Sequence, residues 1–164
     1  MVDSASVTAS PVPGPPGFDG ANKGDGIKGH ILVDTTGVLV AAVVTPADVQ
    51  HRAAFPTPLR QAKRIAPTTT HLWADKGYPG SAVADAAAKV GVTVDIVSGL
   101  KPGRGFIVQP RRRVVEPTNG WINHCPRLDR HHETTLEAHA GFPILSQIAL
   151  PLPRLDRTQL FDTL

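Results

Sequence analysis

The chain has 164 residues, enough for one domain with a moderate core, and it contains 15 Gly and 16 Pro. Hydrophobic residues make up 41% of the chain and aromatic residues only 5%, so Ala and Val must fill much of the core. The formal net charge of +3 permits a polyanionic partner without requiring one. Cys125 is the single cysteine, which excludes an internal disulfide framework and a multi-cysteine zinc cluster. With no apolar run long enough to span a bilayer and no secretory signal, the sequence predicts a cytoplasmic protein without a membrane partner.

The first third of the chain is rich in β-branched residues and turn residues. Residues 2–8 predict a short strand, and the Pro- and Gly-rich segment 10–28 predicts a long loop. Two β-branched runs at 30–34 and 38–45 are separated by Thr-Thr-Gly at 35–37, which predicts a hairpin.

Helices and strands are expected to alternate in the middle of the chain. The pattern predicts a helix over 58–65, a strand over 71–75, a helix over 81–90 and a strand over 92–97. Ser81 is the expected N-cap of the second helix, and Gly91 is its expected C-cap glycine.

The last third of the chain has helical spacing that is interrupted by helix breakers. Arg111 onward follows a helical pattern but contains Pro117. Residues 133–150 are again helical in pattern, with interruptions at Gly141 and Pro143.

The order of these elements predicts the fold class. Three strands followed by alternating helices and strands indicate an α/β protein with a mixed five-stranded sheet, whose later strands are parallel and flanked by helices. This pattern is compatible with an RNase H-like fold.

Three carboxylates occupy positions that could form one site. Asp3 lies in the first predicted strand, Asp75 ends the fourth, and Glu116 enters a helix after an arginine cluster. If the first and fourth strands are neighbours, both aspartates open onto the same edge of the sheet. Hard divalent cations take oxygen ligands, and a pair of them can stabilise both the attacking and the leaving oxygen in phosphoryl transfer. A solvated or capping role is the alternative for each acid taken alone, because most Asp and Glu residues are exposed.

Five sequence blocks around these acids follow one another in a recognisable order. They are DSASVTAS at 3–10, GFDGA at 17–21, GIKGHILVDT at 26–35, WADKGY at 73–78 and PRRRVVE at 110–116. Together they resemble the DDE transposases of bacterial insertion sequences, in the insertion-sequence-four/five-like group that carries its glutamate in an Arg-x-x-x-Glu helix. The resemblance covers about residues 3–136 and implies an RNase H-like catalytic domain.

The resemblance also implies a reaction and the residues that perform it. Asp3, Asp75 and Glu116 match the DDE triad, which binds Mg²⁺ or Mn²⁺ and activates water to nick the end of the element. The freed 3′-hydroxyl then attacks target DNA. The implied partners are the inverted-repeat ends of the element, the target DNA and a second copy of the transposase during synapsis, in a nucleoid-associated location.

Basic residues near the triad are candidates for contact with DNA phosphates. Arg112 matches the arginine that precedes the family glutamate by four residues, and it could also steady Glu116. The complete candidate set is Lys28, His30, Lys76, Arg111, Arg112 and Arg113.

Departures from the family pattern shape the expected domain organisation. We expect a catalytic domain over 1–136 with a loop insertion at 10–29, followed by a degenerate or disordered tail over 137–164. The chain begins two residues before Asp3, so we expect a truncated first strand and no end-recognising helical region. Pro117 disfavours a helical conformation at Glu116. These departures predict that the chain alone is inactive.

Other functions stay open on the sequence alone. One is a non-catalytic remnant that binds DNA or an intact transposase, and another is a different metal-dependent nuclease on the same fold. The segment at 24–29 matches the letters of a dinucleotide fingerprint, but it follows a loop and precedes a strand, the reverse of what pyrophosphate binding needs. A second cluster lacks the paired spacing of zinc ligands and is more often ordinary surface; it comprises His124, Cys125, His131 and His132.

Overall fold

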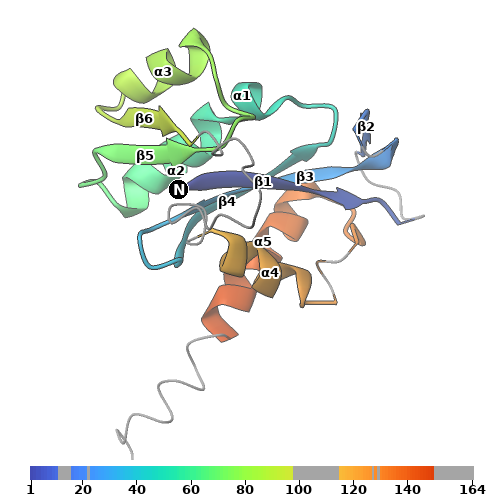
Figure 1. The fold of residues 1–164 in the computed structure, drawn as a ribbon. Coiled ribbons are helices and arrows are strands. Elements are labelled where there is room, and N and C mark those ends of the chain that lie inside the picture. Colours follow the sequence, from blue (N-terminus) through green and yellow to red (C-terminus); the bar gives the residue numbers. More distant parts are fainter. Residues whose placement is uncertain (11–15, 22, 98–114, 127, 129, 150–164) are drawn as a thin grey trace, which may run out of the picture.

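The computed structural model describes residues 1–10, 16–21, 23–97, 115–126, 128 and 130–149. These residues form a curled mixed sheet with helices on both of its faces (Figure 1). Within the described part of the chain, no helix is long and apolar enough to cross a membrane. The arrangement confirms the predicted α/β class.

Strand β1 lies at the centre of the sheet. It pairs antiparallel with β3 on one side and parallel with β5 on the other, and β6 continues the parallel half beyond β5. Both β2 and β4 pair antiparallel with β3. The sheet therefore has an antiparallel half and a parallel half, which meet at β1. This arrangement is compatible with an RNase H-like fold. The strand bounds are β1 Val2–Thr8, β2 Gly17–Asp19, β3 Gly24–Val33, β4 Leu39–Pro46, β5 His71–Ala74 and β6 Thr93–Ile96.

Helices cover the two faces of the sheet in separate groups. Figure 1 shows α1 and α3 on one side of the sheet and α4 and α5 on the other. Helix α2 belongs with α3, because both pack into the same apolar cluster. The bounds are α1 His51–Ala54, α2 Pro56–Ile65, α3 Ser81–Ala88, α4 Glu116–Asn123 and α5 Leu136–Ala149.

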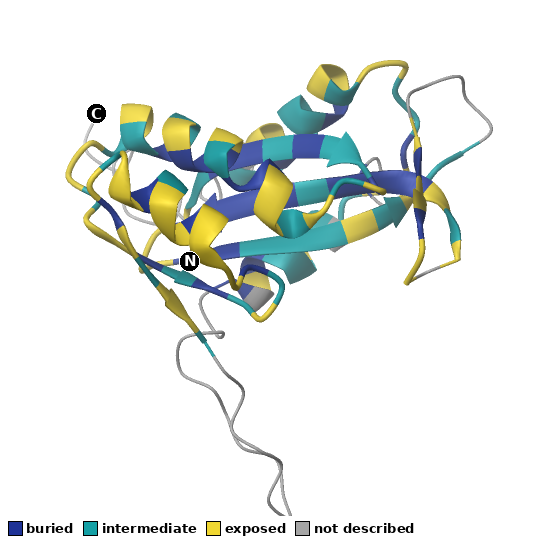
Figure 2. Cartoon of the chain, turned by 90° about the horizontal axis from the view of Figure 1, so that it is seen from above, coloured by how far each residue is buried: buried dark blue, intermediate teal, exposed yellow. Residues whose placement is uncertain are grey.

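Successive residues of β3 face opposite cores because side chains alternate along a strand. Leu32 packs into the core beneath α2 with Leu59, whereas Ile31 and Val33 pack into the other core with Val115. Residues 30–33 of β3 are consequently buried on both faces of the sheet, and Figure 2 shows buried residues running along the strands between the helices. This explains why the strand sequence is a continuous apolar run rather than an alternating one.

The predicted loop over 10–28 is corrected by the structure. Strand β2 covers Gly17–Asp19, and β3 begins at Gly24, so part of the glycine-rich segment is sheet. Gly26 pairs with Thr8 of β1, and a Cβ at Gly26 would lie only 2.3 Å from the backbone oxygen of Val7. Glycine at this position permits a close approach of two backbones. In the sequence, a strand glycine of this kind looks the same as the glycine of a loop. The dinucleotide-like letters at 24–29 lie inside β3, a strand that is followed by β4 and not by a helix.

The predicted hairpin and the middle elements are confirmed, with small shifts at their ends. The turn between β3 and β4 contains Gly37 at φ 88°, and Gly91 after α3 has φ 67°. The N-cap of α3 is Gly80, not Ser81, which is the first helical residue and makes no capping hydrogen bond. A short helix, α1, precedes α2 and was not predicted from the sequence.

The C-terminal elements differ from the sequence expectation in their continuity. Helix α4 begins at Glu116, later than the expected helix start at Arg111, and residues 98–114 lie outside the described part of the chain. Helix α5 runs through both Gly141 and Pro143 and packs against β4. Residues 137–149 of the predicted tail are thus helical, residues 150–164 are not described, and a domain boundary at 136 stays a prediction.

Candidate catalytic site

Asp3 lies near the start of β1, and Asp75 directly follows the last residue of the adjacent strand β5. Val2 of β1 is the parallel partner of Ala74, the last residue of β5, so each aspartate comes one residue after this pair. Both side chains are half-buried. The juxtaposition confirms that the first and fourth predicted strands are neighbours, and it brings the two acids to adjacent positions.

Hydrogen bonds fix the carboxylate of each aspartate. The backbone N–H of Ser4 donates to Oδ1 of Asp3 at 2.9 Å, and Nδ2 of Asn119 donates to Oδ2 of Asp3 at 2.8 Å. The backbone N–H of Gly77 donates to Oδ1 of Asp75 at 2.9 Å. Hydrogen bonds to an ionised acceptor are stronger than neutral ones, so these contacts favour two charged, oriented carboxylates.

The bond from Asn119 brings helix α4 over Asp3. Glu116 is the first residue of α4, and positions three apart in a helix share a face. Position 116 therefore lies on the face of α4 that carries Asn119, although the Glu116 side chain is outside the described part of the structure. Pro117 occupies the first turn of α4, where its missing N–H costs no helical hydrogen bond.

His51, at the start of α1, is a further member of this site. Its Nδ1 hydrogen-bonds with the Ser4 hydroxyl, and its ring meets the ring of Tyr78 edge-on at 5.6 Å between centroids. Tyr78 is fully buried, and burial raises its pKa, so its hydroxyl stays neutral. No pattern in the sequence pointed to His51, because its partners lie far along the chain on β1 and in the segment after β5.

Opposing influences act on the protonation of His51. Burial lowers the pKa of its imidazole, and the nearby Lys28 ammonium lowers this pKa further. The carboxylates around it raise the same pKa by a smaller amount; they belong to Asp75, Asp3 and Asp19. The net direction is downward, which favours a neutral ring beside two charged acids.

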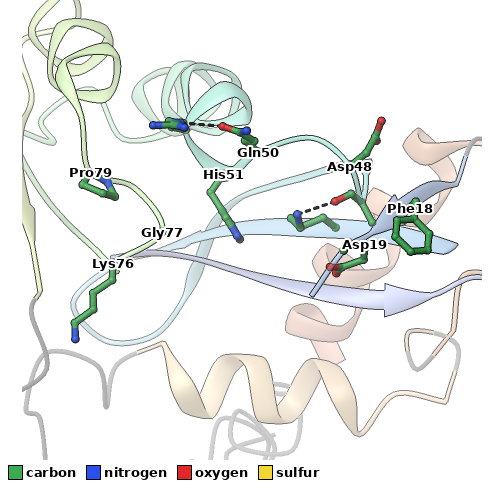
Figure 3. A pocket seen from close by; sticks show the side chains of 12 residues that line it. Phe18, Asp19, Asp48, Gln50, His51, Lys76, Gly77 and Pro79 are labelled. Carbon is green, nitrogen blue, oxygen red and sulfur yellow. Dashed lines mark hydrogen bonds between the residues drawn. The ribbon is translucent and has the colours of Figure 1, made fainter. Parts of the chain in front are cut away.

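A pocket of about 340 Å³ opens beside the acids. Figure 3 shows His51 pointing toward its interior from α1, while the Lys76 side chain extends away from it. Phe18, which is 60% exposed, and Asp19 of β2 line its far side. The pocket thus lies between β2, the start of α1 and the segment that follows Asp75, and neither Asp3 nor Asp75 is among its lining residues.

The predicted phosphate-binding residues that the structure describes differ in their exposure. Lys76 is exposed next to Asp75. Lys28 is only 8% exposed, and its Nζ donates to the carbonyls of Ala47 at 2.8 Å and Val49 at 3.2 Å.

His30 is fully buried, and it hydrogen-bonds with Thr45 through Nε2 at 3.0 Å. Burial, with help from the nearby His51 and Lys28, lowers the pKa of His30 to about 4, so it is neutral at pH 7. Arg111, Arg112 and Arg113 lie outside the described residues. Phosphate contact by this set stays a prediction, and Lys76 is the described member that is exposed beside the acids.

The donor set suits a hard divalent cation. Asp3 and Asp75 supply carboxylate oxygens at one edge, already oriented by hydrogen bonds, and such ligands are the ones that Mg²⁺ and Mn²⁺ prefer. Among the side chains that the structure describes, no three His, Cys, Asp or Glu residues form a group able to hold a metal ion. Glu116 at the start of α4, whose side chain lies outside the described part of the structure, stays the predicted third carboxylate ligand.

The fold is that of a mixed α/β protein compatible with the RNase H-like class, with two carboxylates at adjacent positions near the start of β1 and just after β5. A family model described as transposase DDE domain matches residues 1–150. The chain therefore belongs to the transposase DDE domain family, which links it to DNA transposition and implies DNA as substrate. Domains of this family generally use divalent metals. No match was found among curated proteins.

Proposed function

We propose that this chain is a catalytic domain for metal-dependent DNA cleavage and strand transfer, in which Asp3, Asp75 and Glu116 hold Mg²⁺ or Mn²⁺. The observation that carries the proposal is the hydrogen bond from Asn119 of α4 to Asp3. It draws the helix that begins at Glu116 toward the acids on β1 and after β5. Membership of a narrower insertion-sequence group stays part of the proposal.

The chain's own residues prepare this site for phosphoryl transfer. Ser4 and Asn119 orient the Asp3 carboxylate, and Gly77 orients that of Asp75, before any ligand arrives. A divalent cation, when bound, supplies Lewis-acid stabilisation of phosphoryl oxygens and lowers the pKa of water. The exposed Lys76 ammonium next to Asp75 is placed to meet a backbone phosphate.

Local structure favours catalysis over the inactive remnant. The expectation of inactivity depended in part on Pro117, yet α4 accommodates this residue in its first turn. Strand β1 is paired with β3 over seven residue pairs, so the strand that carries Asp3 is well supported.

A nicking assay with an acid-to-amide variant tests the proposal. The purified chain should nick a supercoiled plasmid carrying the DNA that flanks its reading frame, in the presence of Mn²⁺ and not of EDTA. Asp75→Asn should lower the nicking rate by at least about 100-fold, because it removes a charged ligand from the transition state. Asp85→Asn is the matched control, since Asp85 is exposed on α3 away from the site.

Two results would count against this function. Nicking that is unchanged in Asp75→Asn would exclude the carboxylate site as its source. Salt-sensitive DNA binding without Mn²⁺-dependent nicking would instead support the non-catalytic remnant.

A further inference from the structure

His51 contacts both segments that orient the paired acids. Its Nδ1 is hydrogen-bonded with the Ser4 hydroxyl on β1. Its ring also abuts Gly77, where a side-chain Cβ, if alanine replaced the glycine, would lie 3.3 Å from Cγ and Cδ2 of His51 and 3.1 Å from Oδ1 of Asp75. The imidazole and the Asp75 carboxylate thus both lie close to the position that a Cβ at residue 77 would occupy.

The two residues that His51 contacts are the ones that bind the carboxylates. Ser4 donates its backbone N–H to Asp3, and Gly77 donates its backbone N–H to Asp75, both at 2.9 Å. His51 therefore bonds the side chain of the residue that donates to Asp3, and its ring lies near the residue that donates to Asp75. These donors lie on β1 and in the turn after β5, which are joined in the sheet by a single residue pair, Val2 with Ala74.

Packing holds the His51 ring in one orientation. The ring meets Tyr78 at 5.6 Å and His30 at 6.1 Å between centroids, and both neighbours are fully buried. Tyr78 in turn packs edge-on against Phe55, which follows α1 and is also fully buried. A side chain braced in this way can fix the distance between two backbone segments.

We propose that His51 is a positioning residue for the metal-binding site, holding Ser4 and Gly77 so that Asp3 and Asp75 present their carboxylates together. The inference rests on the proposed function, because it concerns the same acids. The positioning contact is made by Nδ1 of the His51 ring, which is hydrogen-bonded with the Ser4 hydroxyl. Replacing a residue that supports metal ligands in this way typically weakens metal affinity 10- to 100-fold.

The test compares three substitutions of His51 by Mn²⁺ titration calorimetry of the whole chain. His51→Ala removes the ring and should weaken Mn²⁺ binding by about 10-fold or more. His51→Asn keeps a polar atom at the Nδ1 position and should recover most of the affinity. His51→Gln places its amide nearer the Nε2 position and should not. His71→Ala is the matched control, because His71 is exposed at the opposite end of β5.

A second arm separates positioning from general destabilisation. Ser4→Ala should weaken Mn²⁺ binding, and combining it with His51→Ala should add little, because the two residues act through one contact. Urea unfolding of each variant measures its loss of stability. The ranking of the variants by stability should differ from their ranking by Mn²⁺ affinity.

The outcomes distinguish this inference from the proposed function. Unchanged Mn²⁺ affinity in His51→Ala, with the original chain binding Mn²⁺, overturns the role of His51 and leaves the carboxylate site standing. If Mn²⁺ affinity is recovered by His51→Gln and not by His51→Asn, the proposed role is also overturned, because the Nε2 atom rather than the Nδ1 atom would then make the important contact. An original chain that binds no Mn²⁺ overturns both.

Discussion

At the scale of single residues, the site depends on contacts between side chains that are far apart in sequence. Asn119 and Asp3 are separated by 116 positions, yet their hydrogen bond joins α4 to β1. The acceptor is a half-buried carboxylate, which makes this bond stronger than one between neutral groups. Its loss should therefore be measurable in stability as well as in function.

Replacing Asn119 tests this contact. Asn119→Ala should lower the free energy of unfolding by about 1 to 2 kcal/mol, because Asp3 loses a charge-assisted hydrogen bond in a half-buried position. Asn119→Asp should lower it further at pH 7, since a second carboxylate would face Asp3. Urea unfolding measures both changes, and the added loss in Asn119→Asp should shrink when Mn²⁺ is present. Equal stability of all three proteins would show that the Asn119 contact is not formed.

At the scale of elements, the pairing of β1 with β3 decides whether the site exists. This antiparallel ladder spans seven residue pairs and holds the strand that carries Asp3. The glycine-rich start of β3 makes the pairing possible, because Gly26 lets the backbone of β1 approach closely. Gly26 thus has a structural role that composition did not reveal.

A pair of glycine substitutions in β3 tests that approach. Gly26→Ala should lower the free energy of unfolding by about 1 to 3 kcal/mol, because its Cβ would overlap the backbone oxygen of Val7. Gly24→Ala is the matched control in the same strand, since nothing lies within 4 Å of its Cβ position. Thermal or urea unfolding of the two variants measures the difference. Similar stability of the two would mean that β1 and β3 are not in this register.

Elements near the C-terminus show that proline position matters more than proline number. Pro117 stands in the first turn of α4, where it removes no helical hydrogen bond, whereas Pro143 lies inside α5. Helix α5 nevertheless continues to Ala149 and packs against β4. Tertiary packing therefore offsets the local cost at Pro143.

At the scale of the whole molecule, several histidines are held in environments that disfavour their charged form. Burial is the largest cause in each case, and it lowers the pKa of both His30 and His139 to about 4. His131 lies beside His139, with their Nδ1 atoms 3.5 Å apart, and its pKa is lowered too. All of these shifts have the same sign, so their effects on stability add in one direction.

Stability is expected to fall as the pH is lowered from about 6.5 toward 4. In this window the unfolded chain binds protons that the folded chain excludes, so the free energy of unfolding decreases with falling pH and is fully retained above it. The shift of fully buried His30 alone corresponds to about 3 kcal/mol. Urea unfolding between pH 7 and 4.5 measures the slope, and His30→Gln should flatten it. His71→Ala, at an exposed position, should leave the slope unchanged, and a slope unaltered in His30→Gln would contradict the assignment.

The α/β class, most of the strands and helices, and the family could be predicted from the sequence alone, and the three acids were proposed from it. These features depend on local patterns: β-branched runs in β3 and β4, the Gly37 turn, the Ala-rich α3 and the order of the motif blocks. Such patterns act over a few residues, so they can be read without knowing what lies across the sheet.

Only the tertiary structure decided which side chains meet. Asp3 is bonded from α4 and its neighbour Ser4 from α1, and Lys28 and His30 are buried against the segment before α1, α1 itself and the turn after β5. The same is true of Gly26, whose role depends on the backbone of β1 rather than on its own neighbours in sequence. Contacts between distant segments are set by strand register and by packing on both faces of the sheet. Neither the register nor the packing can be read from a short stretch of sequence.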